Sequence, residues 1–230
     1  MKRLLKFLAS QVDVDIYERL MMHPILKNEF KDIASVPTFE SREDLWDECI
    51  ARQVGSKTKI TYVEFGVHEG YSLKYFSQKN LNKDSTFIGL DSFEGLPENW
   101  GYVPKGTFDT KGNMPDIKDG RVSFIKGWFQ NTWDELYAQL STTESLVVHY
   151  DADLYSSTLF ALSKIDILKK TYIAIFDEFT GHEIRALYNY LQAYNASASF
   201  IGKTIDSGFA CQVMCKIVPN NIRMPTPSEL

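Results

Sequence analysis

The sequence predicts an α/β fold built on one sheet of seven strands, mostly parallel, with an antiparallel last strand. Two observations carry this prediction. Short β-branched and aromatic runs alternate with segments whose apolar residues recur every three to four positions, as in strands joined by crossover helices. The last two apolar runs, residues 197–204 and 209–218, are separated only by Ile205 to Gly208, whose composition suits a hairpin turn.

Composition excludes several classes of protein. The chain has 230 residues, 44% of them hydrophobic and 24% charged, which is ordinary for a single globular domain. A net charge of -5 argues against a nucleic-acid groove, and no apolar run approaches the ~18 residues of a membrane span. Cys49, Cys211 and Cys215 lack metal-site spacing and fit reduced thiols. We therefore expect a cytoplasmic protein with neither a nucleic-acid nor a membrane partner.

The N-terminal segment lacks strand signals. Helices are predicted at Lys2–Ser10, Asp15–Met22 and Arg42–Val54, the last with Ser41 as its N-cap. This helical extension could cover the site or form a homo-oligomer contact, or it could simply complete the core. The predicted parts of the chain are a helical N-terminal cover over residues 1–57, one domain over 58–220 and a C-terminal tail over 221–230.

A glycine turn follows the first predicted strand, Ile60–Phe65. Gly66 and Gly70 are four positions apart, so the backbone can turn sharply and a ligand can approach it without meeting a Cβ atom. The free N–H groups of a following helix would favour an anion. The turn therefore has the properties of a cofactor cradle.

The second predicted strand, Thr86–Leu90, ends in Asp91. A carboxylate at the carboxyl edge of this strand can accept hydrogen bonds from both hydroxyls of a ribose. Dinucleotide-binding folds also place an acidic residue at about this distance after the first glycine. Their turn, however, carries Gly-x-Gly-x-x-Gly, and His68 stands here at the second glycine position. The turn thus lacks the pyrophosphate fingerprint.

A long loop follows Pro97. About twenty residues rich in Gly, Pro, Asp and aromatics show no period, and such loops in compact domains are usually lids or binding loops. Trp100, Tyr102 and Phe108 would give it an apolar surface for an organic acceptor. A disordered surface excursion is the alternative.

Acidic residues follow the next parallel strands. After a third strand at 121–126, Gly127 and Trp128 form a turn, and Thr132 with Glu135 predicts a capping box for a helix to Leu140. Strands four and five, 145–150 and 171–176, are joined by a helix over 156–170, and a further helix is predicted at 183–194.

Strand four delivers Asp151, and strand five delivers Asp177 and Glu178, to one edge of the sheet. Gathered carboxylates repel unless a hard cation neutralises them, and carboxylate oxygens suit magnesium. A hydroxyl bound to such a metal loses its proton more easily.

Four sequence blocks, in this order, resemble those of the macrocin O-methyltransferase family of class I S-adenosylmethionine-dependent methyltransferases. They are Gly89–Pro97, Gly127–Thr132, Asp151–Thr158 and Phe176–Phe179. The resemblance implies a Rossmann-like class I methyltransferase fold. It also implies a magnesium-assisted enzyme that methylates a hydroxyl of a small molecule, such as a sugar of a natural product.

The resemblance also assigns site residues. Asp151, Asp177 and Glu178 would bind the metal, with Glu178 replacing an aspartate of the family pattern. Leu154 stands where the similar catechol O-methyltransferase has its lysine base, so His182, four residues after Glu178, is the favoured base beside Asp151. S-adenosylmethionine would be bound by Glu64, Gly66, Gly70, Ser72, Asp91, Ser92, Gly127, Trp128 and Asp151.

Three functions remain in competition. The first is an S-adenosylmethionine-dependent O-methyltransferase acting on a small-molecule hydroxyl. A nicotinamide-dependent oxidoreductase is the second, and the missing Gly-x-Gly-x-x-Gly weighs against it. The third is a catalytically inactive nucleoside-binding module, which gives no reason for an acidic cluster whose repulsion carries an electrostatic cost.

Overall fold

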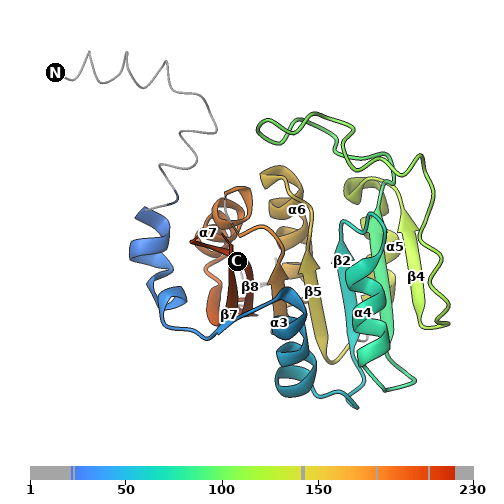
Figure 1. Cartoon of the computed structure of the whole chain (residues 1–230), viewed down its shortest axis with the longest axis horizontal. Coiled ribbons are helices and arrows are strands. Elements are labelled where there is room, and N and C mark those ends of the chain that lie inside the picture. The colour runs from blue at the N-terminus through green and yellow to red at the C-terminus, as the bar shows by residue number, and fades with distance from the viewer. Residues whose placement is uncertain (1–21, 23, 141–142, 180, 207, 221–230) are drawn as a thin grey trace, which may run out of the picture.

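The computed structural model describes residues 22, 24–140, 143–179, 181–206 and 208–220, and it forms one sheet with helices on both faces (Figure 1). The strands are β1 (Thr38–Phe39), β2 (Thr61–Phe65), β3 (Thr86–Asp91), β4 (Val122–Lys126), β5 (Leu146–Tyr150), β6 (Tyr172–Phe176), β7 (Ser197–Asp206) and β8 (Phe209–Val218). The α-helices are α3 (Arg42–Glu48), α4 (Tyr71–Lys79), α5 (Phe129–Leu140), α6 (Tyr155–Ile165) and α7 (His182–Tyr194). Short π and 3₁₀ segments are η1 (Ile25–Glu29), η2 (Lys31–Ala34), η3 (Cys49–Val54) and η4 (Asp166–Leu168).

The strand order is β1-β7-β8-β6-β5-β2-β3-β4. Strand β8 runs antiparallel to both β6 and β7, and the other neighbouring pairs are parallel. The predicted mostly parallel sheet with an antiparallel last strand is confirmed. The eighth strand, β1, was not predicted, because two residues paired with Lys203 and Thr204 are too few to show a period.

Alternate residues of the central strands face two separate cores. Val63 and Phe65 of β2 face a core built with α5, α6 and α7, whereas Tyr62 faces a core built with α3 and α4. Figure 1 shows α3 and α4 together on one side of the sheet. Every residue of β2, β5 and β6 is buried, as expected for parallel strands covered on both faces.

The N-terminal prediction is partly testable. Lys2–Ser10, nearly all of Asp15–Met22, the proposed oligomer contact through them and the tail 221–230 lie outside the described residues. The helix predicted from Arg42 is confirmed as α3, which η3 continues to Val54. Ser41 caps it through a capping box, because its hydroxyl accepts the Asp44 amide and the Asp44 side chain accepts the Ser41 amide.

The capping box predicted at Thr132 is wrong. Helix α5 begins at Phe129, three residues earlier, so Thr132 lies within the helix and its hydroxyl donates to the Trp128 carbonyl at 3.2 Å. The reason lies at Gly127, whose φ of 147° turns the chain into the helix directly after β4.

Two predictions from composition can also be compared with the structure. All three cysteines are free thiols. Within the described part of the chain, no helix has the length and apolarity needed to cross a membrane.

Candidate functional site

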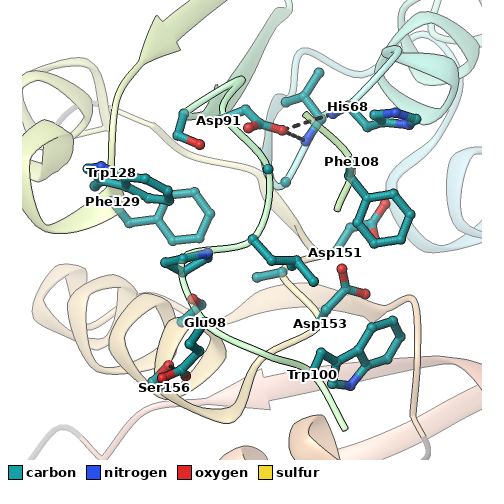
Figure 2. A pocket seen from close by; sticks show the side chains of 18 of the residues that line it. His68, Asp91, Glu98, Trp100, Phe108, Trp128, Phe129, Asp151, Asp153 and Ser156 are labelled. Carbon is teal, nitrogen blue, oxygen red and sulfur yellow. Dashed lines mark hydrogen bonds between the residues drawn. The ribbon is translucent and has the colours of Figure 1, made fainter. Parts of the chain in front are cut away.

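A cavity of about 790 Å³ opens at the carboxyl ends of β2, β3, β5 and β6 (Figure 2). Ligand pockets commonly enclose roughly 300–1,000 Å³, so the cavity has room for a sizeable ligand. It is lined by the glycine turn, the long loop, the start of α5 and the acidic strand ends. The lining residues used below are Arg42, Gly66, Val67, His68, Asp91, Ser92, Glu98, Trp100, Lys105, Phe108, Trp128, Asp151, Asp153, Asp177 and Glu178.

Gly66 lies where the ends of β2 and β5 approach each other. A Cβ atom at this position would lie 1.8 Å from the carbonyl oxygen of Asp151, and the backbone has a φ of 93°. Both observations require glycine here. The close approach sets the glycine turn directly beside Asp151, so the predicted cradle and the predicted acidic edge form one site.

Asp91 ties the glycine turn to β3. Its Oδ2 accepts the backbone N–H groups of Val67 at 2.8 Å and His68 at 2.9 Å, and its Oδ1 accepts that of Phe93 at 2.7 Å. Figure 2 shows the carboxylate reaching across to the turn from the edge of the cavity. Asp91 therefore lies where the sequence predicted it, although the turn itself uses much of its hydrogen-bonding capacity.

Glu64 and Ser72 lie beneath the turn and do not line the cavity. The Ser72 hydroxyl donates to Glu64 Oε1 at 2.5 Å, and the Tyr62 hydroxyl donates to Oε2 at 2.9 Å. Burial raises the pKa of Glu64 to about 7, against the opposing effect of His149. The structure thus corrects the predicted cofactor contacts of both residues, because each is buried and bonded to the other.

The other predicted cofactor residues divide into two groups. Ser92 and Trp128 line the cavity, and the Ser92 hydroxyl also accepts the Glu94 amide at 3.1 Å. Gly70 and Gly127 are not lining residues, and a Cβ atom at Gly70 would lie 2.9 Å from the Pro115 ring. These two glycines shape the turns, and the long loop covers the first of them.

Four carboxylates from the ends of β5 and β6 line the same part of the cavity. Burial raises the pKa of Asp151 well above its usual range, and Asp177 and Glu64 add to the effect. The pKa of Asp153 rises to about 7, through burial and then repulsion by Asp177 and Glu178. The pKa of Glu178 is also raised, first by burial and then by Asp177. The predicted gathering of acids at this edge is therefore present, and so is its electrostatic cost.

The predicted metal set is not preformed. Across the described residues, no three His, Cys, Asp or Glu side chains are arranged to hold a metal ion. Asp151, Asp177 and Glu178 share the cavity, but Asp177 is engaged elsewhere. Its Oδ1 accepts the side-chain amide of Gln212 and lies 3.6 Å from His149 Nε2.

His182 does not reach the cavity. Its Nδ1 accepts the backbone N–H of Tyr155 at 3.0 Å, at the junction of α6 and α7, and the ring is not among the lining residues. The sequence placed His182 near the acids of β6, but its ring bonds the first residue of α6. We therefore do not retain it as the base.

The long loop contributes part of the cavity wall. Trp100 and Phe108 line the cavity as predicted, whereas Tyr102 is 91% exposed and lies outside it. The Phe108 ring contacts that of His68, with centroids 5.6 Å apart. The start of the loop is held to α6, because the Ser156 hydroxyl on this helix donates to Glu98 Oε1 at 2.8 Å.

Arg42 and Asp153 also line the cavity, although neither is among the predicted site residues. Asp153 has a φ of 58° and does not cap α6, whose N-cap is Leu154 without a side-chain bond. In Figure 2 its carboxylate projects between the rings of Phe108 and Trp100. Its place within the resembling block Asp151–Thr158 was the one available signal, whereas Arg42 gave none.

Comparison with known proteins supports the fold. No protein-family model matches the chain, and no curated protein matches it. The strand order and the cavity at the carboxyl edge define a Rossmann-like fold of the class I methyltransferase kind.

Solved structures show this likeness in detail. The calicheamicin methyltransferase CalS11 is similar over 89% of this chain and 93% of its own, with a TM-score of 0.56 and 18% identity. A second structure of CalS11, described as a TDP-rhamnose 3'-O-methyltransferase, has a TM-score of 0.50 and 19% identity. The similarity covers 89% of this chain and 95% of that one. The O-methyltransferase from Bacillus cereus in complex with SAH has a TM-score of 0.52 and 11% identity. The similarity covers 93% of this chain and 96% of that one. Identities this low establish the shared fold.

Proposed function

We propose that the protein transfers a methyl group from S-adenosylmethionine to a hydroxyl of a small organic acceptor. The observation that carries the proposal is the single cavity that joins the glycine turn and Asp91 to the acidic ends of β5 and β6. A cofactor and an acceptor bound there would share one enclosed space, as a direct transfer between them requires. The likeness to O-methyltransferases of known structure agrees with this arrangement.

Asp91, Ser92 and Trp128 would hold the nucleoside. Two carboxylate oxygens offer about four acceptor positions, and three protein amides occupy three of them on Asp91. Capacity therefore remains for a ribose hydroxyl. The Trp128 ring offers an apolar face inside the same cavity.

Trp100, Phe108 and Asp153 would hold the acceptor. Aromatic rings cover the apolar faces of an organic ring, and a carboxylate between them accepts a hydroxyl hydrogen. We propose a sugar as the acceptor class, which the description of CalS11 as a TDP-rhamnose 3'-O-methyltransferase also supports. Asp153 is the group that we propose as the proton acceptor, because it lines the cavity and caps no helix.

We extend the proposal to magnesium, held by Asp151 and Asp177 with Glu178 beside them. The donor set fits a hard cation, because carboxylates that share a cavity and repel one another gain from a positive charge. A bound magnesium ion would make the acceptor hydroxyl more acidic. Asp177 could bind it through Oδ2 while Oδ1 keeps the hydrogen bond from Gln212.

The nicotinamide alternative meets an obstacle in the turn. Dinucleotide folds use the backbone amides at this position to bind a pyrophosphate. Here Asp91 already accepts the amides of Val67 and His68, so a pyrophosphate would have to displace a carboxylate. This observation favours a cofactor without phosphate groups.

Calorimetric titration tests the cofactor. S-adenosylmethionine and S-adenosylhomocysteine should bind saturably, while NAD and NADP should not. Saturable NAD binding with no heat from either sulfur nucleoside would overturn the proposal. A methyl-transfer assay with nucleotide-linked sugars then separates an enzyme from an inactive binding module.

The free thiols are consistent with the cytoplasm as the compartment that we propose.

A further inference from the structure

We propose that Arg42 binds the carboxylate of the methionine moiety, so that the N-terminal segment supplies part of the cofactor site. The inference rests on the proposed function and adds a residue that the sequence analysis did not include among the cofactor-binding residues. Arg42 is the first residue of α3 and lines the cavity together with Gly66, Val67 and His68 of the glycine turn.

Two aromatic rings lie beside the guanidinium. Its central carbon lies 4.9 Å from the centroid of the Tyr71 ring and 5.3 Å from that of Trp46. Tyr71 is the first residue of α4, which begins directly after the glycine turn. The packing of α3 on α4 therefore brings a positive charge to the end of the cavity that the turn forms.

Several donors at this turn are already used within the protein. Asp91 accepts the amides of Val67 and His68, and the Val67 carbonyl accepts that of Gly70 at 2.8 Å. The Ser72 hydroxyl donates to Glu64. An anionic group that reaches this end therefore gains from a charged partner on another element.

The charges around the cavity leave few alternatives. Among the described lining residues there are six carboxylic acids, and the basic side chains are Arg42 and Lys105. Lys105 lies in the long loop, where its backbone N–H bonds the Asn99 side chain at 2.8 Å. Arg42 is the basic side chain that stands beside the turn. A carboxylate among six acids needs this counter-charge.

The present partner of Arg42 is weak enough to give way. Its Nε lies 3.3 Å from Glu43 Oε1, and the two side chains are 46% and 31% exposed. Exposed ion pairs of this kind contribute little to stability. Glu43 also has a second partner, because it accepts the Tyr71 hydroxyl at 2.9 Å. The guanidinium can therefore turn to a ligand carboxylate and bind it through two parallel N–H donors.

The contact between Arg42 and the carboxylate can be tested with two ligands that share a nucleoside and differ in the amino-acid end. S-adenosylhomocysteine carries the carboxylate, and 5'-methylthioadenosine lacks the whole amino-acid end. Calorimetry should show that Arg42→Gln weakens S-adenosylhomocysteine by about 10- to 100-fold. Binding of 5'-methylthioadenosine should change by less than about twofold. Arg42→Lys keeps the charge but lacks the two parallel N–H donors of the guanidinium, so its loss of S-adenosylhomocysteine affinity should be intermediate.

The matched control is Arg52→Gln. Arg52 lies in η3, pairs with Glu48 at 3.3 Å and has a 78% exposed side chain, so both ligands should bind as in the wild type. If Arg42→Gln weakens both ligands equally, or neither, the assignment is overturned while the proposed function stands. If the wild-type protein binds neither ligand, the proposed function falls and this inference falls with it.

Discussion

His149 Nε2 lies 3.6 Å from Asp177 Oδ1, across the neighbouring strands β5 and β6. The other ring nitrogen, Nδ1, is 2.7 Å from the Tyr62 hydroxyl, which also bonds Glu64. Buried polar groups thus run from Glu64 through Tyr62 to His149, whose second ring nitrogen lies near a carboxylate of the cavity. Removal of His149 would take one of two buried partners from the Tyr62 hydroxyl.

The first prediction is that His149→Leu lowers the free energy of unfolding by about 2 kcal/mol, because the Tyr62 hydroxyl loses its buried hydrogen bond to Nδ1. Urea denaturation measures the change. His182→Gln is the control, since its ring accepts one amide at a half-buried position, and it should cost about 1 kcal/mol or less. Equal losses in the two variants would contradict the importance of this buried hydrogen bond.

The second prediction concerns pH. Burial raises the pKa of Glu64 from 4.5 to about 7, so the folded protein holds a proton that the unfolded chain releases. The stabilisation is complete below the unfolded pKa and is lost as pH rises through the folded pKa. Glu64→Gln, which stays neutral, should therefore be more stable than the wild type at pH 8, by at most about 3 kcal/mol, and lose this advantage by pH 5.

Thermal unfolding across this pH range tests the second prediction. Glu135→Gln, an exposed position on α5, is the control and should follow the wild-type curve. If the melting temperatures of the wild type and of Glu64→Gln differ by the same amount from pH 5 to pH 8, Glu64 is ionised in the folded state throughout this range.

The third prediction uses the long loop. Trp100→Ala should raise the acceptor KM by about tenfold, because the ring covers part of the cavity, and should leave S-adenosylhomocysteine affinity within about twofold. Tyr102→Ala changes an aromatic residue of the same loop that is 91% exposed and outside the cavity, so its kinetics should match the wild type. Similar losses in both variants would mean that the loop as a whole, and not Trp100, matters for the acceptor.

The fourth prediction is a requirement for magnesium. Exhaustive EDTA treatment should abolish methyl transfer, and magnesium should restore it and raise the melting temperature. Asp177→Asn should remove both effects of magnesium while S-adenosylhomocysteine still binds. Asp116→Asn is the control, because this exposed aspartate pairs with Lys118 away from the cavity. Full activity after chelation would remove the metal from the mechanism and leave the transferase proposal intact.

The sequence predicted those parts of the molecule that depend on local pattern. Strands with continuous apolar runs were located to within a residue or two, and Asp91, Asp151 and Asp177 were placed at strand ends because the strands fix them there. The turn chemistry around Gly66 was also visible, since glycine at this spacing has few other uses.

Features set by tertiary contacts could not be predicted in this way. Ser72 faces Glu64 and not the cavity, because two elements pack with both groups on the same buried face. His182 bonds a neighbouring helix, which spacing along the chain does not reveal. Arg42 looked like an ordinary charged residue in a first helical turn, and only the packing of α3 on α4 takes it to the cavity.

Strand β1 also bears on how the chain assembles during synthesis. Thr38 pairs with Lys203 of β7, and the Lys203 ammonium donates to the carbonyl of Ile33, 170 positions earlier, at 2.6 Å. Domains begin to fold from the N-terminus as the chain leaves the ribosome, but long-range pairing must wait for both partners. The segment that leads into Arg42 therefore reaches its final place only after the terminal hairpin has been made. A nascent chain can close the parallel core early, yet the entry to its cofactor pocket is among the last regions to take shape.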